Sequence, residues 1–235
     1  MPEKKDTLSI IDLFNKAKQM EFNNIRYQKQ FISIDVTLFA IDKDALHVLL
    51  VNRNQEPFKG CWSLPGGGLY KDETAEEAVK RELKEKLNVD GVMPSLAGVF
   101  SDPMRDSRMR NISLSYYALA DKNKIIVLKN ESKLKDVRWF NIAQIPPLAF
   151  DHRQILDTSL RLLQDKIYDM AFMKKLLPTS FTLGQLQRIY ESILGAPLDK
   201  RNFRRKLNAL NCLKDTGQKN DNDPRKKSAV FVLAD

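Results

Sequence analysis

The pattern of apolar and polar positions divides the chain into a strand-rich part and a helical part. Two runs rich in β-branched and apolar side chains, 31–41 and 45–53, are separated by the turn-like segment 42–44, which predicts a β-hairpin. A helical pattern runs from Thr74, which forms a capping box with Glu77, to about Leu87. Further strand patterns lie at 95–100, 112–120, 124–128 and 135–140. Strands around one or two helices are typical of a layered α/β domain, which we expect to end near residue 150.

Helical spacing dominates beyond residue 150. A stripe of apolar side chains predicts a helix over 153–170 that links two domains: Ile155, Leu156, Leu160, Leu163 and Ile167. Two shorter helices with a tight break follow. Thr182 and Gln185 form the capping box of the first helix, Gly195 and Pro197 end it, and Asp199 caps the second. Two short apolar segments around a polar, basic stretch then predict a C-terminal hairpin.

Composition narrows the classes of function. The chain has 235 residues, 43% of them hydrophobic, which is enough to bury a sizeable core. Its two cysteines lack the spacing of a disulfide framework or a zinc site, so we expect a reducing cytosol. No run of about 18 uncharged apolar residues occurs, so we expect neither a membrane span nor export. The first thirty residues form a polar leader with one short amphipathic helix predicted over 8–20.

The positive charge is concentrated towards the C-terminus. The net charge of the chain is +9, and residues 199–227 hold ten Lys and Arg against four Asp. This stretch coincides with the second short helix and the hairpin. A solvated basic face is the ordinary explanation, and a nucleic-acid contact is the alternative that this clustering favours.

The stretch from Gly67 to Val89 carries acidic and basic residues at fixed intervals. After Gly67 come five residues, Glu73, seven residues, Arg81-Glu82-Leu83, one residue, Glu85-Lys86, one residue and Asn88-Val89. This spacing resembles the Nudix signature G-x5-E-x7-R-E-U-x-E-E-x-G-U, in which U is apolar, and the preceding Leu64-Pro65-Gly66 is common in that superfamily. Lys86 stands where the signature has a third helix carboxylate, and Asn88 where it has a glycine.

Carboxylates at positions i, i+3 and i+4 of a helix project from one face and can share a hard cation. Glu82 and Glu85 are therefore candidate Mg²⁺ ligands and, if the domain is active, candidate catalytic residues. The resemblance implies that a bound metal would polarise a pyrophosphate and activate water. The Lys86 ammonium would repel that metal, which favours a domain that has lost efficient hydrolysis.

Two other interpretations of the box stay open. A weak or rearranged hydrolase would recruit a substitute ligand from Asp102, Asp106 or Glu131. Alternatively, Glu82 and Lys86 form only a surface ion pair worth about 0.3 to 0.5 kcal/mol.

Arginines in the loop before the strand 112–120 suit phosphate or ribose-phosphate groups, because a guanidinium binds such groups with two parallel hydrogen bonds. The loop carries Arg105, Arg108 and Arg110, and it resembles the corresponding loop of ADP-ribose-type Nudix proteins. A solvated basic loop is the alternative. Trp62 either stacks on a base or lies in the core. Our candidate effector-binding residues are Arg53, Gly67, Arg81, Glu82, Arg105, Arg108 and Tyr116.

The C-terminal elements occur in the order of a winged helix-turn-helix: helix, turn, helix and basic hairpin. Phe203, Leu207 and Leu210 are expected to face inward, and Asn208 to face outward. Arginine and asparagine pair with base edges, and the other basic residues can neutralise phosphates. The wing loop is placed at 217–227 and includes Lys219 and Arg225. The candidate DNA-binding residues are Arg201, Asn202, Arg204, Arg205, Lys206, Lys226 and Lys227. An amphipathic helix with an ordinary charged face is the alternative.

From about residue 31 to its end, the chain resembles the Nudix-related transcriptional regulators. The segments that carry this resemblance include 147–152, FTLGQLQ and RNFRRKL. It implies a Nudix-type α/β/α sandwich with a mixed sheet over 31–150, a linking helix over 151–170 and a winged helix-turn-helix over 171–235. It also implies a cytoplasmic homodimer that binds a double-stranded DNA operator without a cofactor, with an ADP-ribose-like or pentose effector.

The competing hypothesis is a Nudix hydrolase that cleaves ADP-ribose or a related nucleoside diphosphate with Mg²⁺. Its C-terminal part would then serve as a dimerisation arm or an RNA contact.

Overall fold

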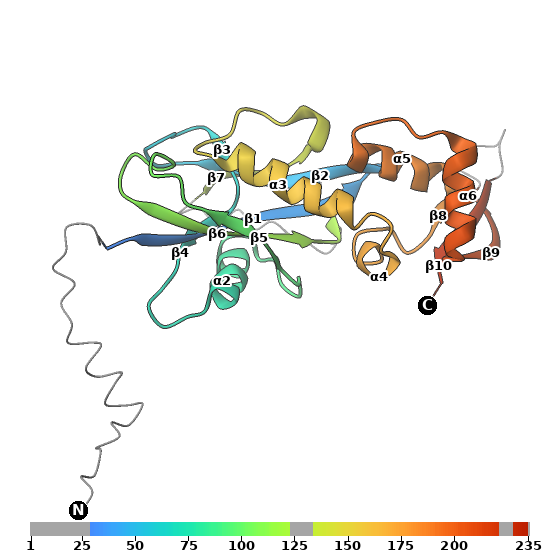
Figure 1. The fold of residues 1–235 in the computed structure, drawn as a ribbon, viewed down its shortest axis with the longest axis horizontal. Helices are drawn as coiled ribbons and strands as arrows, with labels where there is room; N and C mark the ends of the chain where they lie inside the picture. The colour runs from blue at the N-terminus through green and yellow to red at the C-terminus, as the bar shows by residue number, and fades with distance from the viewer. Residues whose placement is uncertain (1–28, 123–133, 221–227, 235) are drawn as a thin grey trace, which may run out of the picture. The chain divides into compact units, whose positions relative to one another are not determined.

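The computed structural model describes residues 29–122, 134–220 and 228–234 (Figure 1). Several expectations lie outside these residues: the helix 8–20, the strand 124–128, Glu131, and Arg225, Lys226 and Lys227 of the wing. No helix in the described ranges combines the length and the apolar character that crossing a bilayer requires. The domain boundaries given above stay predictions.

Within the described residues, seven strands form one mixed sheet. Its path is β3-β2-β1-β6-β5, with β4 paired to β1 and β7 paired to β2. The strands are β1 (Phe31–Asp42), β2 (Ala45–Arg53), β3 (Trp62–Ser63), β4 (Gly66–Gly68), β5 (Ser95–Phe100), β6 (Asn111–Leu119) and β7 (Leu134–Asn141). The β1–β6 pair is parallel and the others are antiparallel. The β1–β2 hairpin is confirmed, and its turn residues Lys43 and Asp44 both have positive φ, as tight hairpin turns require.

The two faces of the sheet are covered by different helices, α2 (Ala75–Leu87) and α3 (His152–Asp165), which lie on opposite sides in Figure 1. Side chains alternate between the faces of a strand. Ile34, Val36 and Leu38 of β1 therefore share a core with α2, whereas Phe39 shares one with α3. The expected α/β/α sandwich is confirmed.

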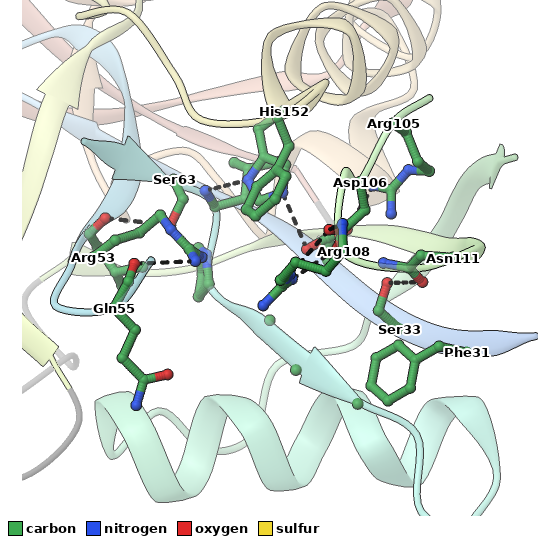
Figure 2. A pocket seen from close by; sticks show the side chains of 18 of the residues that line it. Phe31, Ser33, Arg53, Gln55, Ser63, Arg105, Asp106, Arg108, Asn111 and His152 are labelled. Carbon is green, nitrogen blue, oxygen red and sulfur yellow. Dashed lines mark hydrogen bonds and ion pairs between the residues drawn. The ribbon is translucent and has the colours of Figure 1, made fainter. Parts of the chain in front are cut away.

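Helix α2 has the expected bounds, and the three glycines before it form the short strand β4 (Figure 2). The capping box is present: Thr74 Oγ1 accepts from the Glu77 amide at 3.2 Å, and the Glu77 carboxylate accepts from the Thr74 amide at 2.7 Å. Asn88 ends the helix in the left-handed conformation with φ +51°, which asparagine tolerates better than most residues. A Cβ on Gly66 would lie 2.2 Å from the Ile34 carbonyl oxygen, so the pairing of β4 with β1 requires a glycine there.

The linking helix is shorter than expected. The prediction of a helix over 153–170 was wrong at its C-terminal end, because α3 stops at Asp165 and a turn follows. Asp169 then accepts a hydrogen bond from the Phe172 amide at 3.0 Å and begins a separate helix, α4 (Met170–Met173). Ile167 lies in the turn and is still buried. The apolar spacing over 153–170 therefore predicted which positions are buried, but not where the helix ends.

The C-terminal elements form a winged helix-turn-helix, with a small sheet in the order β8-β10-β9. They are β8 (Phe181–Thr182), α5 (Leu183–Leu194), α6 (Lys200–Leu210), β9 (Leu213–Asn220) and β10 (Ser228–Leu233). The caps at Thr182 and Asp199 and the left-handed Gly195 are confirmed. Two details differ. Leu210 is 41% exposed, because it ends α6 just before the left-handed Asn211. β9 extends to Asn220, so the segment expected to be a loop from Gly217 begins as a strand.

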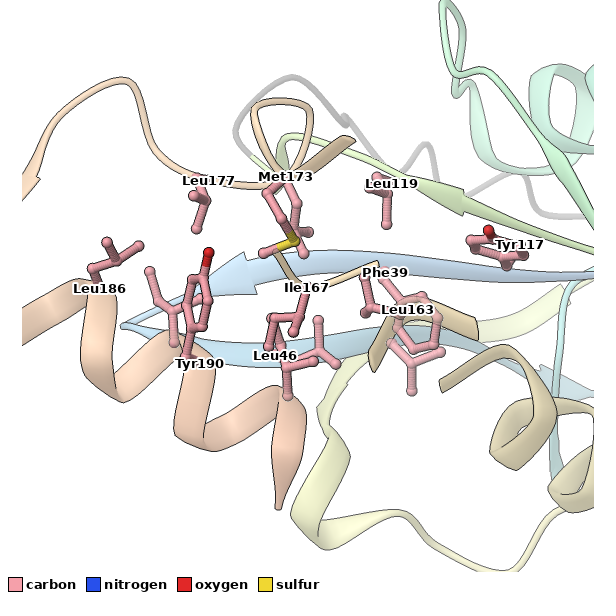
Figure 3. Close-up of a cluster of buried hydrophobic side chains, with 14 of the residues drawn as sticks. Phe39, Leu46, Tyr117, Leu119, Leu163, Ile167, Met173, Leu177, Leu186 and Tyr190 are labelled. Carbon is pink, nitrogen blue, oxygen red and sulfur yellow. The ribbon is translucent and has the colours of Figure 1, made fainter. Parts of the chain in front are cut away.

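One hydrophobic core continues from the sheet into the winged helix (Figure 3). Leu46 of β2 belongs to the same buried cluster as Leu163 of α3 and Tyr190 of α5. Polar contacts support this junction: the Leu46 amide donates to Ser192 Oγ at 2.9 Å, and Arg188 lies 2.7 Å from Asp44 in the hairpin turn. The β1–β2 hairpin is thus in direct contact with α5.

We predict that Leu46→Ala loosens α5 although the substitution lies in the other domain. Truncation of a buried leucine costs about 2 to 5 kcal/mol, and here the cavity would open against the winged helix. Amide hydrogen exchange of residues 186–194 should accelerate more in Leu46→Ala than in Leu38→Ala, an equally buried leucine that faces α2. Equal acceleration in the two variants would contradict a shared core.

Candidate functional site

A cavity of about 450 Å³ lies beside β1 and β4, between the loop that precedes β6 and the segment that precedes α3 (Figure 2). Its lining is rich in charged side chains and glycine backbone. The residues most relevant to binding are Asp35, Arg53, Gly67, Lys86, Arg108 and Phe150. Of the seven candidate effector-binding residues, Arg53, Gly67, Arg105 and Arg108 line this cavity.

An aromatic ring and two guanidinium groups lie together in the cavity. The guanidinium carbons of Arg53 and Arg108 lie 4.7 and 5.5 Å from the centre of the Phe150 ring. Arg53 Nε donates to the Pro57 carbonyl at 2.9 Å, whereas Arg108 pairs with Asp106 at 2.7 Å and keeps a side chain that is 48% exposed. This arrangement brings two positive charges and one aromatic ring to the same cavity.

Arg105 lines the cavity and is buried, with its guanidinium bound by two carboxylates. Its Nε and an Nη donate to Asp151 at 2.9 and 2.8 Å, and the Nη lies 3.3 Å from Asp35 Oδ2. Burial lowers the pKa of Arg105, but these two carboxylates outweigh burial and raise it. Arg105 therefore holds together three segments of the chain.

His152 completes this buried network. Its Nδ1 accepts from the Leu64 amide at 2.9 Å and its Nε2 lies 3.4 Å from Asp35 Oδ1, so the proton of the neutral ring belongs on Nε2. Burial lowers the pKa of His152, an effect that the charges of Asp35 and Asp151 only partly oppose. Ser113 Oγ donates to Asp35 Oδ2 at 2.6 Å.

Of this network, only Arg105 was predicted from the sequence as a binding residue, and Asp35, Ser113, Asp151 and His152 were missed. One usable signal was Asp35, a carboxylate between the apolar Ile34 and Val36 in the middle of a predicted strand.

Glu82 and Lys86 meet beside the glycine strand. Glu82 is 4% exposed; its Oε1 accepts from Arg81 at 2.7 Å, and its Oε2 lies 2.5 Å from Lys86 Nζ. Lys86 Nζ also donates to the Gly66 carbonyl at 2.5 Å. A Cβ on Gly67 would lie 2.1 Å from Glu82 Oε1, so any side chain at this position would displace the carboxylate. The ion pair expected on the helix surface is present but largely buried.

Two other signature residues of the 67–89 stretch, Glu73 and Arg81, bind each other. Arg81 forms two hydrogen bonds with the Glu73 carboxylate, at 2.8 and 2.6 Å, and donates to the Gly68 carbonyl. The hydrogen bond from Arg81 lowers the pKa of Glu73. Arg81 thus joins the loop that carries Glu73 to helix α2. Arg81 does not line the cavity, and neither does Glu85, which is exposed. In the part of the chain that the structure describes, no group of three or more His, Cys, Asp or Glu side chains is placed to hold a metal ion.

The remaining candidates lie elsewhere. Tyr116 is buried, donates to Glu76 at 3.0 Å and does not line the cavity; burial raises its pKa to about 12. Trp62 packs edge-on against Phe140 and against the core, which agrees with the core interpretation. Three loop residues bond locally: Arg110 with the Ser101 carbonyl, Asp102 with the Met104 amide, and Asp106 with Arg108.

Helix α6 presents a second polar surface. Arg201, Asn202, Arg204, Arg205 and Asn208 line one open hollow. Phe203 and Leu207, on the opposite side of the helix, are buried. Lys206 does not line the hollow, because its Nζ lies 3.3 Å above the Tyr168 ring. Lys219 lies on β9 and is exposed.

Comparison with known proteins identifies both parts of the chain. Residues 32–159 match the NUDIX domain family, and residues 173–233 match the NrtR DNA-binding winged helix domain. The ADPR responsive transcriptional repressor NtrR of Acinetobacter baylyi is 30% identical over 202 residues, which cover 84% of this chain and 80% of that protein. The chain belongs to the Nudix-related transcriptional regulators.

Other relatives of this Nudix regulator include solved structures and an enzyme. The crystal structure of Shewanella oneidensis NrtR with a 27mer DNA matches with a TM-score of 0.69 and 32% identity, covering 86% of this chain and 93% of that one. The NUDIX domain of the same protein with ADP ribose matches with a TM-score of 0.56 and 28% identity, covering 66% and 99%. The ADP-ribose pyrophosphatase of Methanocaldococcus jannaschii is 40% identical over 154 residues, which cover 64% of this chain and 89% of that enzyme.

We predict that the neutral His152 of this Nudix regulator makes its stability fall in weak acid. In the unfolded chain the pKa of histidine is about 6.5, and burial lowers it in the folded chain. The unfolded state therefore binds the proton first, and the free energy of unfolding decreases as pH drops below about 6.5. His152→Asn keeps an acceptor for the Leu64 amide but does not titrate.

Urea unfolding at pH 7, 6 and 5 should show a smaller loss of stability towards acid in His152→Asn than in the unsubstituted chain. Because the chain has only two histidines, NMR can follow each imidazole directly, with His47→Asn to assign the signals. A His152 imidazole that titrates at or above about 6.5 would contradict this account.

Proposed function

We propose that this regulator binds ADP-ribose, or a closely similar nucleoside diphosphate sugar, in the cavity beside β4, and that binding changes the affinity of α6 for DNA. The observation that carries the proposal is the joint presence of Arg53, Arg108 and Phe150 around one cavity next to the Nudix glycines. Guanidinium groups match a diphosphate, and an aromatic ring can stack on a base. The names of three relatives support the ligand, because each mentions ADP-ribose.

A pentose is the weaker candidate for the effector. A free sugar has no negative charge to pair with the cations of the cavity, and it has no flat ring to stack on Phe150. Its hydroxyl groups would leave the guanidinium of Arg108 without a new anionic partner.

Hydrolysis of the bound nucleotide is the second candidate function. It is favoured by the retained Glu73, Arg81, Glu82 and Glu85 and by the similarity to an ADP-ribose pyrophosphatase. Against it, Lys86 already binds the Glu82 carboxylate, and Glu85 does not line the cavity. We therefore propose that the protein binds its nucleotide without turning it over efficiently.

The DNA-binding surface is proposed to be the outward face of α6. Arg201, Asn202, Arg204 and Arg205 are the residue types that contact guanine, adenine and phosphate groups, and they share one hollow. Two such helices in a homodimer would contact two half-sites about 34 to 36 Å apart on a two-fold operator. We also propose that it acts in the cytoplasm, as expected of a DNA-binding regulator.

The first test concerns the ligand. Arg53→Ala and Arg108→Ala should each weaken ADP-ribose binding roughly tenfold, because each removes a charged hydrogen-bond donor facing the diphosphate. Isothermal titration calorimetry of the full chain measures this, and Arg161→Ala on the outer side of α3 is the matched control that should bind normally. Ribose 5-phosphate that binds as tightly as ADP-ribose would contradict the proposed ligand. Turnover of about 1 per second or faster with Mg²⁺ would establish the hydrolase instead.

The second test concerns DNA. A duplex selected by the protein from a random library supplies the probe for fluorescence anisotropy. Arg204→Ala and Arg205→Ala should weaken binding, and a lost phosphate contact should lower the slope of log affinity against log salt by about 0.9. Arg153→Ala, which removes an exposed arginine of α3, should leave both quantities unchanged. If the two α6 variants behave like this control, α6 is not the DNA-binding helix.

A further inference from the structure

Lys86 is folded towards the cavity rather than into solvent. Its Nζ lies 2.5 Å from Glu82 Oε2 and 2.5 Å from the Gly66 carbonyl oxygen, and the residue lines the cavity. An ordinary helix surface pair would leave both groups in water. Here the Glu82 side chain is 5% exposed and the Lys86 side chain 23%. The contact with Gly66 also joins residues twenty positions apart, so it fixes the ammonium against the glycine strand.

The oxygen atoms around this ammonium are the kind that a divalent cation uses. Carboxylate and backbone carbonyl oxygens are the usual ligands of Mg²⁺ and Mn²⁺. Both oxygens of Glu82 already have cationic partners, Arg81 and Lys86, and the Gly66 carbonyl binds Lys86. Glu85 does not line the cavity. The residues present therefore do not fit the metal that the Nudix family implies, because a protein cation already occupies the place between the same oxygens.

We propose that the Lys86 ammonium takes the place of the divalent cation and meets the diphosphate of the ligand, so that the effector binds without metal. This inference rests on the proposed function, since it concerns the same cavity and the same ligand. An ammonium has three donors. One of them donates to the Gly66 carbonyl, the ammonium as a whole forms the ion pair with Glu82, and a remaining donor is available to a phosphate oxygen in the cavity.

The replacement would also separate binding from turnover. A divalent metal lowers the pKa of its bound water and thereby supplies a nucleophile. An ammonium attracts the same anionic group but carries no such water. Lys86 would thus keep the attraction for a diphosphate and remove the means of cleaving it.

The first experiment measures metal binding by the full chain alone. Mn²⁺ titrations followed by electron paramagnetic resonance should show no site of sub-millimolar affinity in the unsubstituted protein. Lys86→Glu, which restores the carboxylate of the signature, should bind Mn²⁺ at least roughly tenfold more tightly. A sub-millimolar site in the unsubstituted protein that Glu82→Gln abolishes would overturn the inference. A folded Lys86→Glu variant with no gain in Mn²⁺ affinity would overturn it as well.

The second experiment measures ADP-ribose binding by calorimetry in EDTA and in Mg²⁺. The unsubstituted chain should bind equally in both, within about twofold, and Lys86→Met should bind roughly tenfold more weakly in both. Lys84→Met is the matched control, because Lys84 lies on the same helix but pairs with Asp90 outside the cavity. Lys86→Met retains the length of the side chain, so this variant still tests the role of the ammonium if Lys86→Glu does not fold.

The two experiments separate two kinds of failure. Binding of ADP-ribose that requires Mg²⁺, or normal binding by Lys86→Met, would overturn the role of Lys86 and leave the proposed ligand intact. Absence of ADP-ribose binding in both buffers would refute the proposed ligand. The Mn²⁺ titration would then still decide whether Lys86 keeps the metal out.

Discussion

The burial of the Arg105 guanidinium between the carboxylates of Asp151 and Asp35 is the constraint on which the cavity depends. The three residues come from the loop before β6, from the position just before α3 and from β1, so one charge cluster holds together three segments around the cavity. Removing one partner from such a buried group leaves a charge without compensation, at a cost of about 3 to 5 kcal/mol. The same cluster orients His152. Its ring accepts a hydrogen bond from the amide of Leu64, which lies just before strand β4 in the sequence. The geometry available to a ligand follows from this network more than from any surface arginine.

Two elements run from that cluster to the winged helix. Helix α3 begins at His152 beside the cavity, and its buried side chains continue into the core that contains Tyr190 of α5. Strand β1 carries Asp35 in the cavity, and its hairpin turn places Asp44 against Arg188 of α5. A ligand that displaces the cavity walls by a small amount therefore acts on elements packed against the DNA-binding domain. A coupling of about 1 to 3 kcal/mol would be enough to change DNA affinity 5- to 150-fold.

Features with local signals could be predicted from the sequence. The capping boxes at Thr74 and Thr182, the β1–β2 hairpin and the order of the winged helix elements depend on residues a few positions apart, and the structure has them as expected. The charge cluster beside the cavity could not be predicted, because Arg105 pairs with Asp151, 46 positions away, and with Asp35, 70 positions away. For the same reason, Lys86 was recognised as a lost metal ligand, but its contact with Gly66 was not foreseen. The predicted burial of Leu210 and the predicted end of α3 were wrong, because helical spacing does not show where a helix ends or where its side chains leave the core.

Communication between the cavity and α6 is the central claim, and thermodynamic linkage tests it most directly. The dissociation constant of ADP-ribose should be measured by calorimetry with the free protein and with the protein saturated by its selected DNA duplex. Linkage requires that DNA change ADP-ribose affinity by the same factor by which ADP-ribose changes DNA affinity. We predict a factor between about 5 and 150 that is equal in both directions. Identical ADP-ribose dissociation constants with and without DNA would contradict the account.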